Sequence, residues 1–282
     1  MNKGRPADLP DFERPPLTEV ALGVQFSSIN FQSVHAGLWW QTVRERFPKV
    51  EEQLPLQPTF ETFGLPQPQV ALPNLTELFG FIRLTRHWFI TGDDTQLIQV
   101  QRDRLLHNWR KRRADQGYPR YEPLRAELEA ELTDFARFAT ANKLGEVKPN
   151  QCEVSYINHI VLDKDVDPNR HLDQIFTVWA NKYSDDYLKH VEGAQLQFRY
   201  VLEGEGEEPI GRLHAAIQPS VDPVSSSPAV QFALTARGKP AEETIAAAVE
   251  WLNEGRKAVV RGFASMTTEA MHQRWGRKHA SQ

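Results

Sequence analysis

The feature that most constrains the fold is one order of elements that occurs twice along the chain. Short segments in which apolar and polar residues alternate are followed by one long segment whose apolar residues repeat with helical spacing. The long segments are residues 122–142 and 241–261. An alternating strand and an amphipathic helix each have one apolar face to bury, and they bury it against each other. The pattern therefore predicts an α+β fold built from antiparallel sheets and long helices.

The first half, residues 17–146, is predicted to run strand, helix, strands, helix. Thr18 to Phe26 alternates as a half-buried strand does, and Ser33 is a suitable N-cap for the helix that follows. Prolines crowd residues 48–77, which we expect to be loop with at most an edge strand at 59–63. Strands are expected next at 78–85, at 87–92 and from 96 to 105, before the long helix.

The second half, residues 147–282, is predicted to repeat this order and to end in a short C-terminal helix. Ala194 to Leu202 alternates and is expected to pair with residues 212–219 across the acidic loop 203–208. The other elements expected are a strand at 153–161, helical turns from Asp167, a strand at 229–237, a long helix from Pro240 to about Arg261 and a short helix from Thr267. We therefore predict two similar halves, each a curved antiparallel sheet packed on a long helix, with their sheets joined edge to edge. Residues 1–16 are expected to form an extended arm.

Composition excludes several classes of protein. Hydrophobic residues make up 40% of the 282 residues and charged residues 25%, which is typical of a globular chain and not of a disordered or collagen-like one. No run of about 18 apolar residues occurs, so no membrane association is expected. The N-terminus lacks the apolar core of a signal peptide, and Cys152 is the only cysteine, so we expect a cytoplasmic protein.

The residue types that carry catalysis or hold metals do not gather in any recognisable pattern. The chain has no HExxH, GxxxxGK[ST] or GxSxG motif, and its nine histidines do not cluster at metal-ligand spacing. Cys152 and His159 lie seven positions apart on a predicted strand, so their side chains should face opposite sides and not form a nucleophile–base pair. We therefore expect no metal, no cofactor and no enzymatic activity.

The strongest local anomaly is the region from Arg102 to Arg125, where arginines outnumber acidic residues and aromatic residues are interleaved with them. We expect the segment 104–121 to connect a strand to the long helix, and therefore to run over the surface. Arginine, tryptophan and tyrosine are enriched at binding hot spots, and their planar groups also suit phosphate contacts and base stacking. The predicted partner-binding residues are Arg104, Asn108, Trp109, Arg110, Arg112, Arg113, Tyr118, Arg120 and Tyr121.

A structural explanation of this region competes with the functional one. Its aromatic residues can fold back to anchor the segment on the core, while its arginines pair with acidic residues elsewhere. In either case we expect Arg110, Arg112 and Arg113 to stay exposed.

A similar choice arises for Trp39 and Trp40, which point about 100° apart on a helix. Either that helix is covered on two sides, or one tryptophan contacts a partner.

Several short motifs carry a resemblance to a known family. They are Pro16-Leu17-Thr18-Glu19-Val20, Asp103 to Arg110 with its Asn108-Trp109-Arg110, Tyr118 to Glu122, Val154 to Ile160 and Trp275-Gly276-Arg277. In these motifs the chain resembles a sporadically distributed family of uncharacterised prokaryotic proteins of about this length. The resemblance covers most of the chain and implies no particular activity. The patchy distribution of the family implies mobile or defence-associated loci, where accessory proteins that bind partners are common.

These observations predict a non-catalytic accessory protein that binds a macromolecular partner, and we expect that partner to be a protein. The setting implied by the resemblance is a prokaryotic defence or mobile-element system. The alternative is an RNA- or DNA-binding module that uses residues 102–121. The formal net charge of −4 provides no general attraction for nucleic acid, so this alternative depends on that local segment. The sequence leaves the oligomeric state open.

Overall fold

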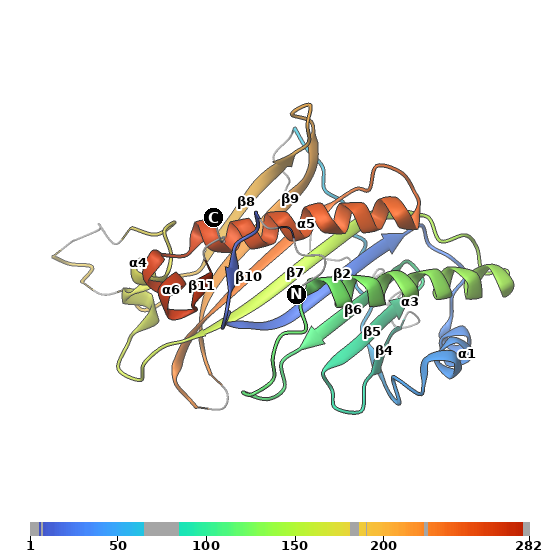
Figure 1. Ribbon diagram of the computed structural model, residues 1–282, viewed down its shortest axis with the longest axis horizontal. Coiled ribbons are helices and arrows are strands. Elements are labelled where there is room, and N and C mark those ends of the chain that lie inside the picture. The colour runs from blue at the N-terminus through green and yellow to red at the C-terminus, as the bar shows by residue number, and fades with distance from the viewer. Residues whose placement is uncertain are drawn as a thin grey trace.

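The computed structural model describes residues 6, 8–64, 85–180, 186–189, 191–222 and 225–278. These residues form an α+β fold in which a nine-stranded antiparallel sheet carries two long helices on one face (Figure 1). The strand order is β3-β4-β5-β6-β2-β7-β10-β9-β8. Among the described residues, no helix combines the length and the apolar character needed to cross a membrane.

The bounds of the elements are as follows. The strands of the large sheet are β2 (Leu17–Phe26), β3 (Lys49–Gln53), β4 (Arg86–Ile90), β5 (Gln96–Gln101), β6 (Arg104–Arg110), β7 (Pro149–Val161), β8 (Leu196–Glu203), β9 (Pro209–Val221) and β10 (Pro228–Gly238). The α-helices are α1 (Ser33–Val43), α3 (Tyr121–Ala141), α4 (Leu172–Ile175), α5 (Ile245–Met266) and α6 (Glu269–Arg274), with a 3₁₀ helix, η1, at Pro168–Arg170. A two-stranded ribbon pairs β1 (Asp11–Phe12) with β11 (Arg277–Lys278).

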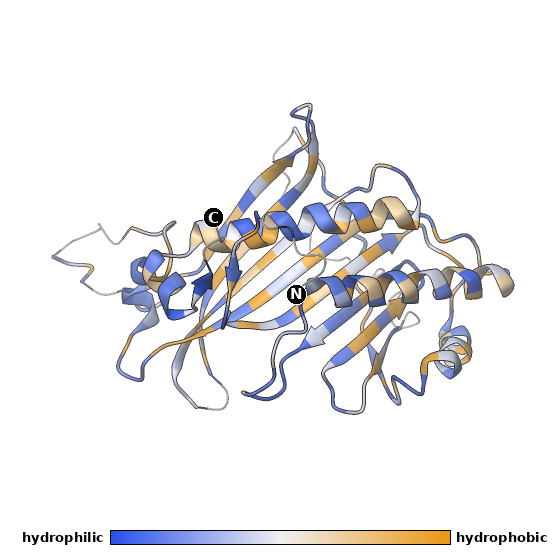
Figure 2. Cartoon of the chain, viewed as in Figure 1, coloured by the Kyte–Doolittle hydropathy of each residue, from blue (hydrophilic) through white to orange (hydrophobic). Residues whose placement is uncertain are grey.

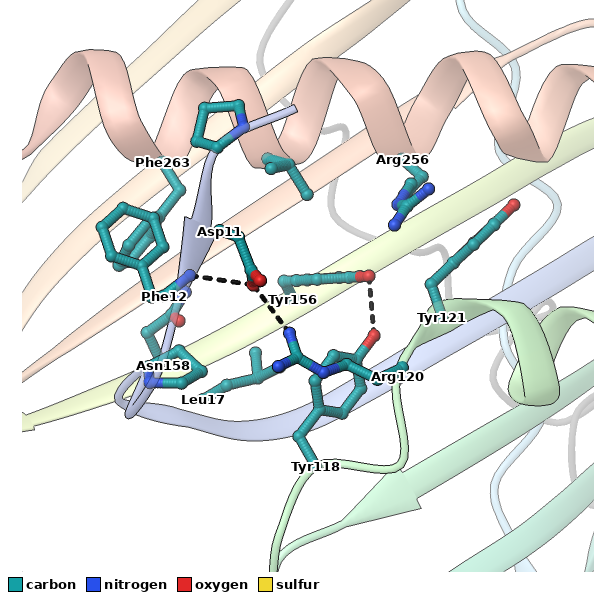
Figure 3. A pocket seen from close by; sticks show the side chains of 13 residues that line it. Asp11, Phe12, Leu17, Tyr118, Arg120, Tyr121, Tyr156, Asn158, Arg256 and Phe263 are labelled. Carbon is teal, nitrogen blue, oxygen red and sulfur yellow. Dashed lines mark hydrogen bonds and ion pairs between the residues drawn. The ribbon is translucent and has the colours of Figure 1, made fainter. Parts of the chain in front are cut away.

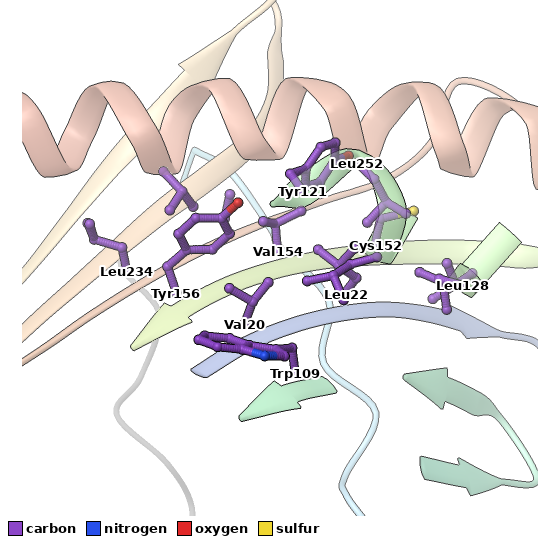
Figure 4. Packing of buried hydrophobic residues seen from close by; sticks show 14 of the residues in the cluster. Val20, Leu22, Trp109, Tyr121, Leu128, Cys152, Val154, Tyr156, Leu234 and Leu252 are labelled. Carbon is purple, nitrogen blue, oxygen red and sulfur yellow. The ribbon is translucent and has the colours of Figure 1, made fainter. Parts of the chain in front are cut away.

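The hydrophobic core lies between the two long helices and the face of the sheet that they cover. Helix α3 packs on β2 and β6, and α5 packs on β7, β10 and β9. Val20 and Leu22 of β2 pair in register with Tyr156 and Val154 of β7, and all four side chains are buried on this face (Figure 4). Figure 2 shows hydrophobic and hydrophilic residues alternating along the strands beneath the helices. Each fully buried aliphatic side chain contributes about 1.5–3 kcal/mol of transfer free energy.

The sheet is continuous from the N-terminal to the C-terminal part of the chain. Residues up to 146 supply β3-β4-β5-β6-β2 and α3, and later residues supply β7-β10-β9-β8 and α5. The two groups of strands meet where β2 pairs with β7. Strand β2 is therefore central, and it is buried on both faces from Val20 to Phe26. The prediction of a half-buried strand was wrong here, because a central strand can be covered on its second side too.

Two further elements differ from the predictions. The expected strand from 96 to 105 is two strands, because the chain turns at Arg102 and Asp103 and continues as β6. Residues 104–110 are therefore part of the sheet and not a surface connection. The edge strand of the proline-dense region is β3, at 49–53, and residues 59–63 form no strand. Most of the strand predicted at 78–85 lies outside the described residues.

The ends of several elements are also shifted. Helix α1 has Gln32 and not Ser33 as its N-cap, and α5 begins only after Thr244, whose side chain accepts a hydrogen bond from the Ala247 N–H at 3.2 Å. The described part of the N-terminal arm is docked, since Phe12 is buried with its ring centroid 5.4 Å from that of Phe263.

The adjacent tryptophans of α1 are both accommodated within the chain. Trp39 is buried and contacts the rings of Phe89 and Phe135. Trp40 is half-buried, and its indole N–H donates to the Phe47 carbonyl oxygen at 2.9 Å. Both rings are thus packed within the chain, and the indole N–H of Trp40 is hydrogen-bonded, whereas that of Trp39 is buried without a hydrogen-bond partner among the described residues.

Candidate functional site

The predicted partner-binding residues do not form one patch, because most of them follow the alternation of a strand. In β6, Asn108 and Arg110 pair in register with Ala21 and Glu19, on the face opposite the helices. Trp109 points the other way, is 2% exposed and packs against Tyr118 at a centroid distance of 5.3 Å. Arg104, Asn108, Trp109 and Tyr121 are all buried. The expectation that this segment runs over the surface was wrong for these four residues.

The second part of the predicted set anchors the start of α3 (Figure 3). The hydroxyl groups of Tyr118 and Tyr156 are hydrogen-bonded at 2.9 Å, and the Arg120 guanidinium pairs with Asp11 at 2.8 Å. Tyr121 donates to the Asn253 side-chain oxygen at 3.1 Å. Burial, followed by the neighbouring Tyr156, raises the pKa of Tyr118 well above its ordinary value.

These anchoring side chains enclose little space. The cavity that they border has a volume of about 60 Å³. Arg120 also holds an unfavourable φ of +79°, and its ion pair with Asp11 helps to fix that conformation. Their contacts support a structural role for Tyr118, Arg120 and Tyr121.

The remaining predicted residues, Arg112 and Arg113, lie beyond the end of β6. Arg112 and Arg113 are exposed, as expected, and Arg113 lies 3.6 Å from the Asp115 carboxylate. Arg110 is only partly exposed, because its guanidinium lies over the ring of Trp88, 5.6 Å from the centroid. A second arginine, Arg86, also lies over this ring, at 5.4 Å.

The face of the sheet opposite α3 and α5, here named the polar face, carries an extended hydrogen-bond network. Arg86 donates to Gln99 at 2.7 Å, Gln99 to Asn108 at 2.7 Å, and Asn108 to Glu19 at 2.7 Å, so one chain of contacts crosses four strands. Towards the C-terminal strands, the Arg237 guanidinium donates to the Glu153 carboxylate at 2.5 Å. Buried polar groups require such partners, because an unpaired one costs about 1–3 kcal/mol.

Residues 54–64, here named the strap, cross the polar face without forming a strand. The Gln101 side chain forms two hydrogen bonds with the main chain of Leu56 in the strap. It accepts from the Leu56 N–H and donates to the Leu56 carbonyl oxygen, both at 2.9 Å. The Thr59 N–H donates to the Gln25 side chain at 2.9 Å. Arg104 donates to the Gln57 carbonyl oxygen at 2.9 Å, and Arg212 donates to that of Thr62 at 3.1 Å. Side chains from β5, β2, β6 and β9 therefore bind main-chain groups of one extended segment.

One strap side chain anchors the segment to β9. The Glu61 carboxylate is 6% exposed, pairs with Arg212 and lies 2.6 Å from His214 Nε2. Burial by itself would raise the pKa of Glu61, but the contacts with His214 and Arg212 outweigh it and hold this pKa below its ordinary value. The Arg212 guanidinium also lies 4.8 Å from the centroid of the Phe63 ring.

The polar face concentrates positive charge near the strap. Burial lowers the pKa of Arg86 and of Arg104, and the Arg104 guanidinium lowers that of Arg86 further. The nearby carboxylates of Glu153 and Asp103 act in the opposite direction on Arg104. Among the described residues, Arg212 and Arg237 form ion pairs with Glu61 and Glu153, whereas Arg86, Arg104 and Arg110 form none.

A charged cluster that the sequence did not point to lies on the opposite, helix-covered face. His107 of β6 is fully buried, with Nδ1 2.9 Å from the Glu131 carboxylate and Nε2 3.2 Å from that of Glu127. Burial opposes its protonation, but the two carboxylates outweigh burial and raise its pKa to about 9. The sequence feature that could have indicated this cluster is the pair of glutamates one helical turn apart on α3, at the border of its apolar face. Nothing local to them identifies His107 as their partner.

The remaining candidate groups are not arranged for chemistry. In the ranges that the structure describes, no three His, Cys, Asp or Glu side chains are placed to hold a metal ion. Cys152 is buried towards α5, with its sulfur 3.8 Å from the Ala248 carbonyl oxygen, and burial raises the pKa of its thiol. It pairs in register with Val24 on the helix-covered face, so His159 lies on the other face of β7, as predicted.

Comparisons with known proteins place no further constraint on the site. No protein-family model matches the chain, and no curated protein matches it significantly.

Proposed function

We propose that this chain is a non-catalytic binding protein whose polar face holds an extended segment of a partner protein. The observation that carries the proposal is the way in which the strap is bound. Five hydrogen bonds join side chains of the sheet to main-chain groups at Leu56, Gln57, Thr59 and Thr62. Contacts to the main chain are available to any extended polypeptide, so the face can bind segments of different sequence.

The chemistry of these contacts favours a polypeptide over a nucleic acid. The Gln101 amide donates and accepts at the same residue, which matches the paired N–H and carbonyl groups of a peptide. A phosphate accepts hydrogen bonds only, and the carboxylates of Glu19 and Glu153 on this face would repel it. Two features favour nucleic acid: the positive charge near the strap, and Trp88 with Arg86 and Arg110 over its ring, since such planes stack on bases.

In this proposal the strap occupies the site until a partner displaces it. It is held by hydrogen bonds and one anchored carboxylate and not by a β-ladder, and Leu54 and Phe60 are exposed. Displacement exchanges one set of main-chain contacts for another, so it does not require the core to open. The apparent affinity for a partner is then reduced by the fraction of molecules whose strap is bound.

We further propose that the two parts of the chain are similar halves and that the protein is a cytoplasmic accessory factor of a prokaryotic defence or mobile-element system. The first idea is supported by the pairing of the first strand with the last in each part, β2 with β6 and β7 with β10. The second is supported by the family resemblance of the sequence motifs.

The proposal is tested with the full chain in which residues 54–64 are replaced by a glycine–serine linker of equal length. A labelled peptide of residues 54–64 should bind this variant, measured by fluorescence anisotropy, and should bind the wild type at least tenfold more weakly. Adding Gln25→Ala and Gln101→Ala should reduce binding, whereas the matched change of an exposed glutamine, Gln41→Ala, should not. Absence of binding by a variant whose circular dichroism spectrum is native would contradict the proposal.

The nucleic-acid alternative predicts a different result. Single- and double-stranded oligonucleotides should then bind the strap-replaced chain at low salt. The affinity for the duplex should fall by roughly 0.9 log unit per log unit of salt for each phosphate contacted. Arg86→Ala should weaken that binding.

A further inference from the structure

Among the strands that the structure describes, β8 is an edge of the large sheet with one side unpaired. It is the last strand in the order β7-β10-β9-β8, and no strand among the described residues pairs with its outer side. An edge strand presents a row of main-chain N–H and C=O groups that can pair with another chain. The outer part of the β8–β9 hairpin also projects beyond α5 (Figure 1), so this edge is not screened by the helix layer.

Apolar side chains at the middle of β8 are exposed. Tyr200 is 42% exposed and Val201 is 48% exposed, on opposite faces of the strand. The Tyr200 ring stacks on that of Phe198, with the centroids 6.4 Å apart. Edge strands usually avoid exposed apolar side chains at their centre, because these promote association.

Two charged residues of β8 have no ionic partner within the described residues. Arg199 and Glu203 are both exposed, and neither forms an ion pair with another residue in the part of the chain that the structure describes. They lie two positions on either side of Val201, and regular alternation along β8 puts them on one face. The pairing with β9 is irregular between Leu202 and Glu203, but the extra residue there is Ile210 of β9. This spacing makes the strand complementary to a second, antiparallel copy of itself.

We propose that two copies of this chain pair through β8, antiparallel and with Val201 opposite Val201 of the second copy. This register places Arg199 opposite Glu203 of the second copy, and the twofold symmetry repeats the pair. Tyr200 then lies opposite Leu202 of the second copy on the other face. A register centred on Arg199 would instead place two arginines opposite each other, which is destabilising. The occupant of the edge is thus a second copy, and the pairing continues the sheet across the dimer axis.

The interface is short, so the dimer should be weak. Interfaces well below about 1,200 Å² of total buried area are typical of transient complexes. Sedimentation equilibrium of the wild type should therefore show a mass that rises towards that of a dimer as concentration increases from low micromolar to submillimolar. A wild-type chain that stays monomeric over this range would overturn the proposal.

Charge reversal tests the register. Arg199→Glu and Glu203→Arg should each weaken self-association at least tenfold, because each places two like-charged pairs in the interface. An equimolar mixture of the two variants should associate at least as well as the wild type, since both pairs are then opposite in charge. The matched control is Arg44→Glu, which reverses an exposed charge on the loop after α1 and should leave association unchanged.

The mixture distinguishes pairing in the proposed register from a loss of association caused by any change of surface charge. If both variants are monomeric and the mixture is also monomeric, the proposed register is wrong.

A cysteine at the axis gives an independent measurement. Val201→Cys should form a disulfide-linked dimer on oxidation with diamide, detected on a non-reducing gel, whereas Gln197→Cys should form much less, because it lies away from the axis. Equal cross-linking at both positions would contradict the register.

Discussion

The two faces of the large sheet are both partly covered, but by different interactions. On one face, α3 and α5 bury apolar side chains of β2 and β7 in a continuous core. On the other, the strap is held by directional hydrogen bonds, in which Gln25 and Gln101 accept from its N–H groups and Arg104 donates to a carbonyl oxygen. Apolar burial is large and non-directional, whereas each hydrogen bond contributes only about 0.5–1.5 kcal/mol net. The helix-covered face therefore maintains the fold, and the main-chain contacts of the polar face agree with our proposal that one extended segment is exchanged there for another.

The largest effect should follow from opening a cavity on the helix-covered face. Leu128 and Leu132 of α3 are fully buried, so Leu128→Ala or Leu132→Ala should lower the free energy of unfolding by about 2–5 kcal/mol. Urea denaturation followed by circular dichroism measures this change. A loss under about 1 kcal/mol at both positions would show that this helix face is not part of the core.

A pH-dependent effect should come from the cluster of His107, Glu127 and Glu131 on that same face. The pKa of His107 is raised from 6.5 to about 9 in the folded chain, so its contribution to stability is complete below pH 6.5 and is lost as the pH rises through 9. The loss between these limits should be on the order of 3 kcal/mol. Urea denaturation at pH 6 and at pH 9.5 measures it. His107→Gln should remove most of this pH dependence, and an unchanged dependence in that variant would assign it to other groups.

Loss of a contact on the polar face should have a smaller, local effect. Gln101→Ala removes both hydrogen bonds to Leu56 and should cost about 1–3 kcal/mol. Amide hydrogen exchange should become faster in the strap, at Leu56 and Thr59, while the amides of β2 keep their protection. Equal acceleration in β2 would mean that the strap is an integral part of the core and that the contrast between the two faces is wrong.

Acid should release the strap at its other end. The pKa of Glu61 is lowered in the folded chain, so its stabilising contribution is present above pH 4.5 and is lost as the pH falls below that value. Limited proteolysis with pepsin at pH 3 and pH 4.5 should show faster cleavage within 54–64 at the lower pH. Glu61→Gln should be cleaved at similar rates, relative to an unrelated substrate, at both values.

The smallest effects on stability are expected at the end of β6. Arg112→Glu with Arg113→Glu should change the free energy of unfolding by less than about 0.5 kcal/mol, because both side chains are exposed. Adding Arg110→Glu should lower the free energy of unfolding by a further amount of about 0.5–1 kcal/mol, because it removes the cation–π contact with Trp88. Thermal unfolding of the double and triple variants compares these values. Unfolding of the double variant would show that Arg112 and Arg113 are structural.

Periodicity determined the features of this chain that depend on local amphipathic pattern. It predicted the α+β class, helix α3 with its buried leucines, the hairpin of β8 and β9, and the opposite orientation of Cys152 and His159. These follow from side-chain spacing along one element, which a sequence displays directly. The same reasoning failed at Arg104 and Asn108, because the turn at Arg102 and Asp103 was not recognised and residues from 104 onward were expected to form a surface connection. Alternation also does not reveal that the polar face of a strand is covered.

Only the tertiary structure decided what each polar side chain contacts. Glu61 and Arg212 are 151 positions apart, and His107 and Glu131 come from a strand and a helix separated by a turn and a connection. Whether a charged side chain is buried depends on a partner that arrives from elsewhere in the chain, because burial without a partner is too costly. The strap was also beyond prediction, since its path rests on side-chain contacts with four strands and leaves no periodic pattern in its own sequence. The core of this protein can thus be read from local spacing, whereas its candidate site exists only where distant segments meet.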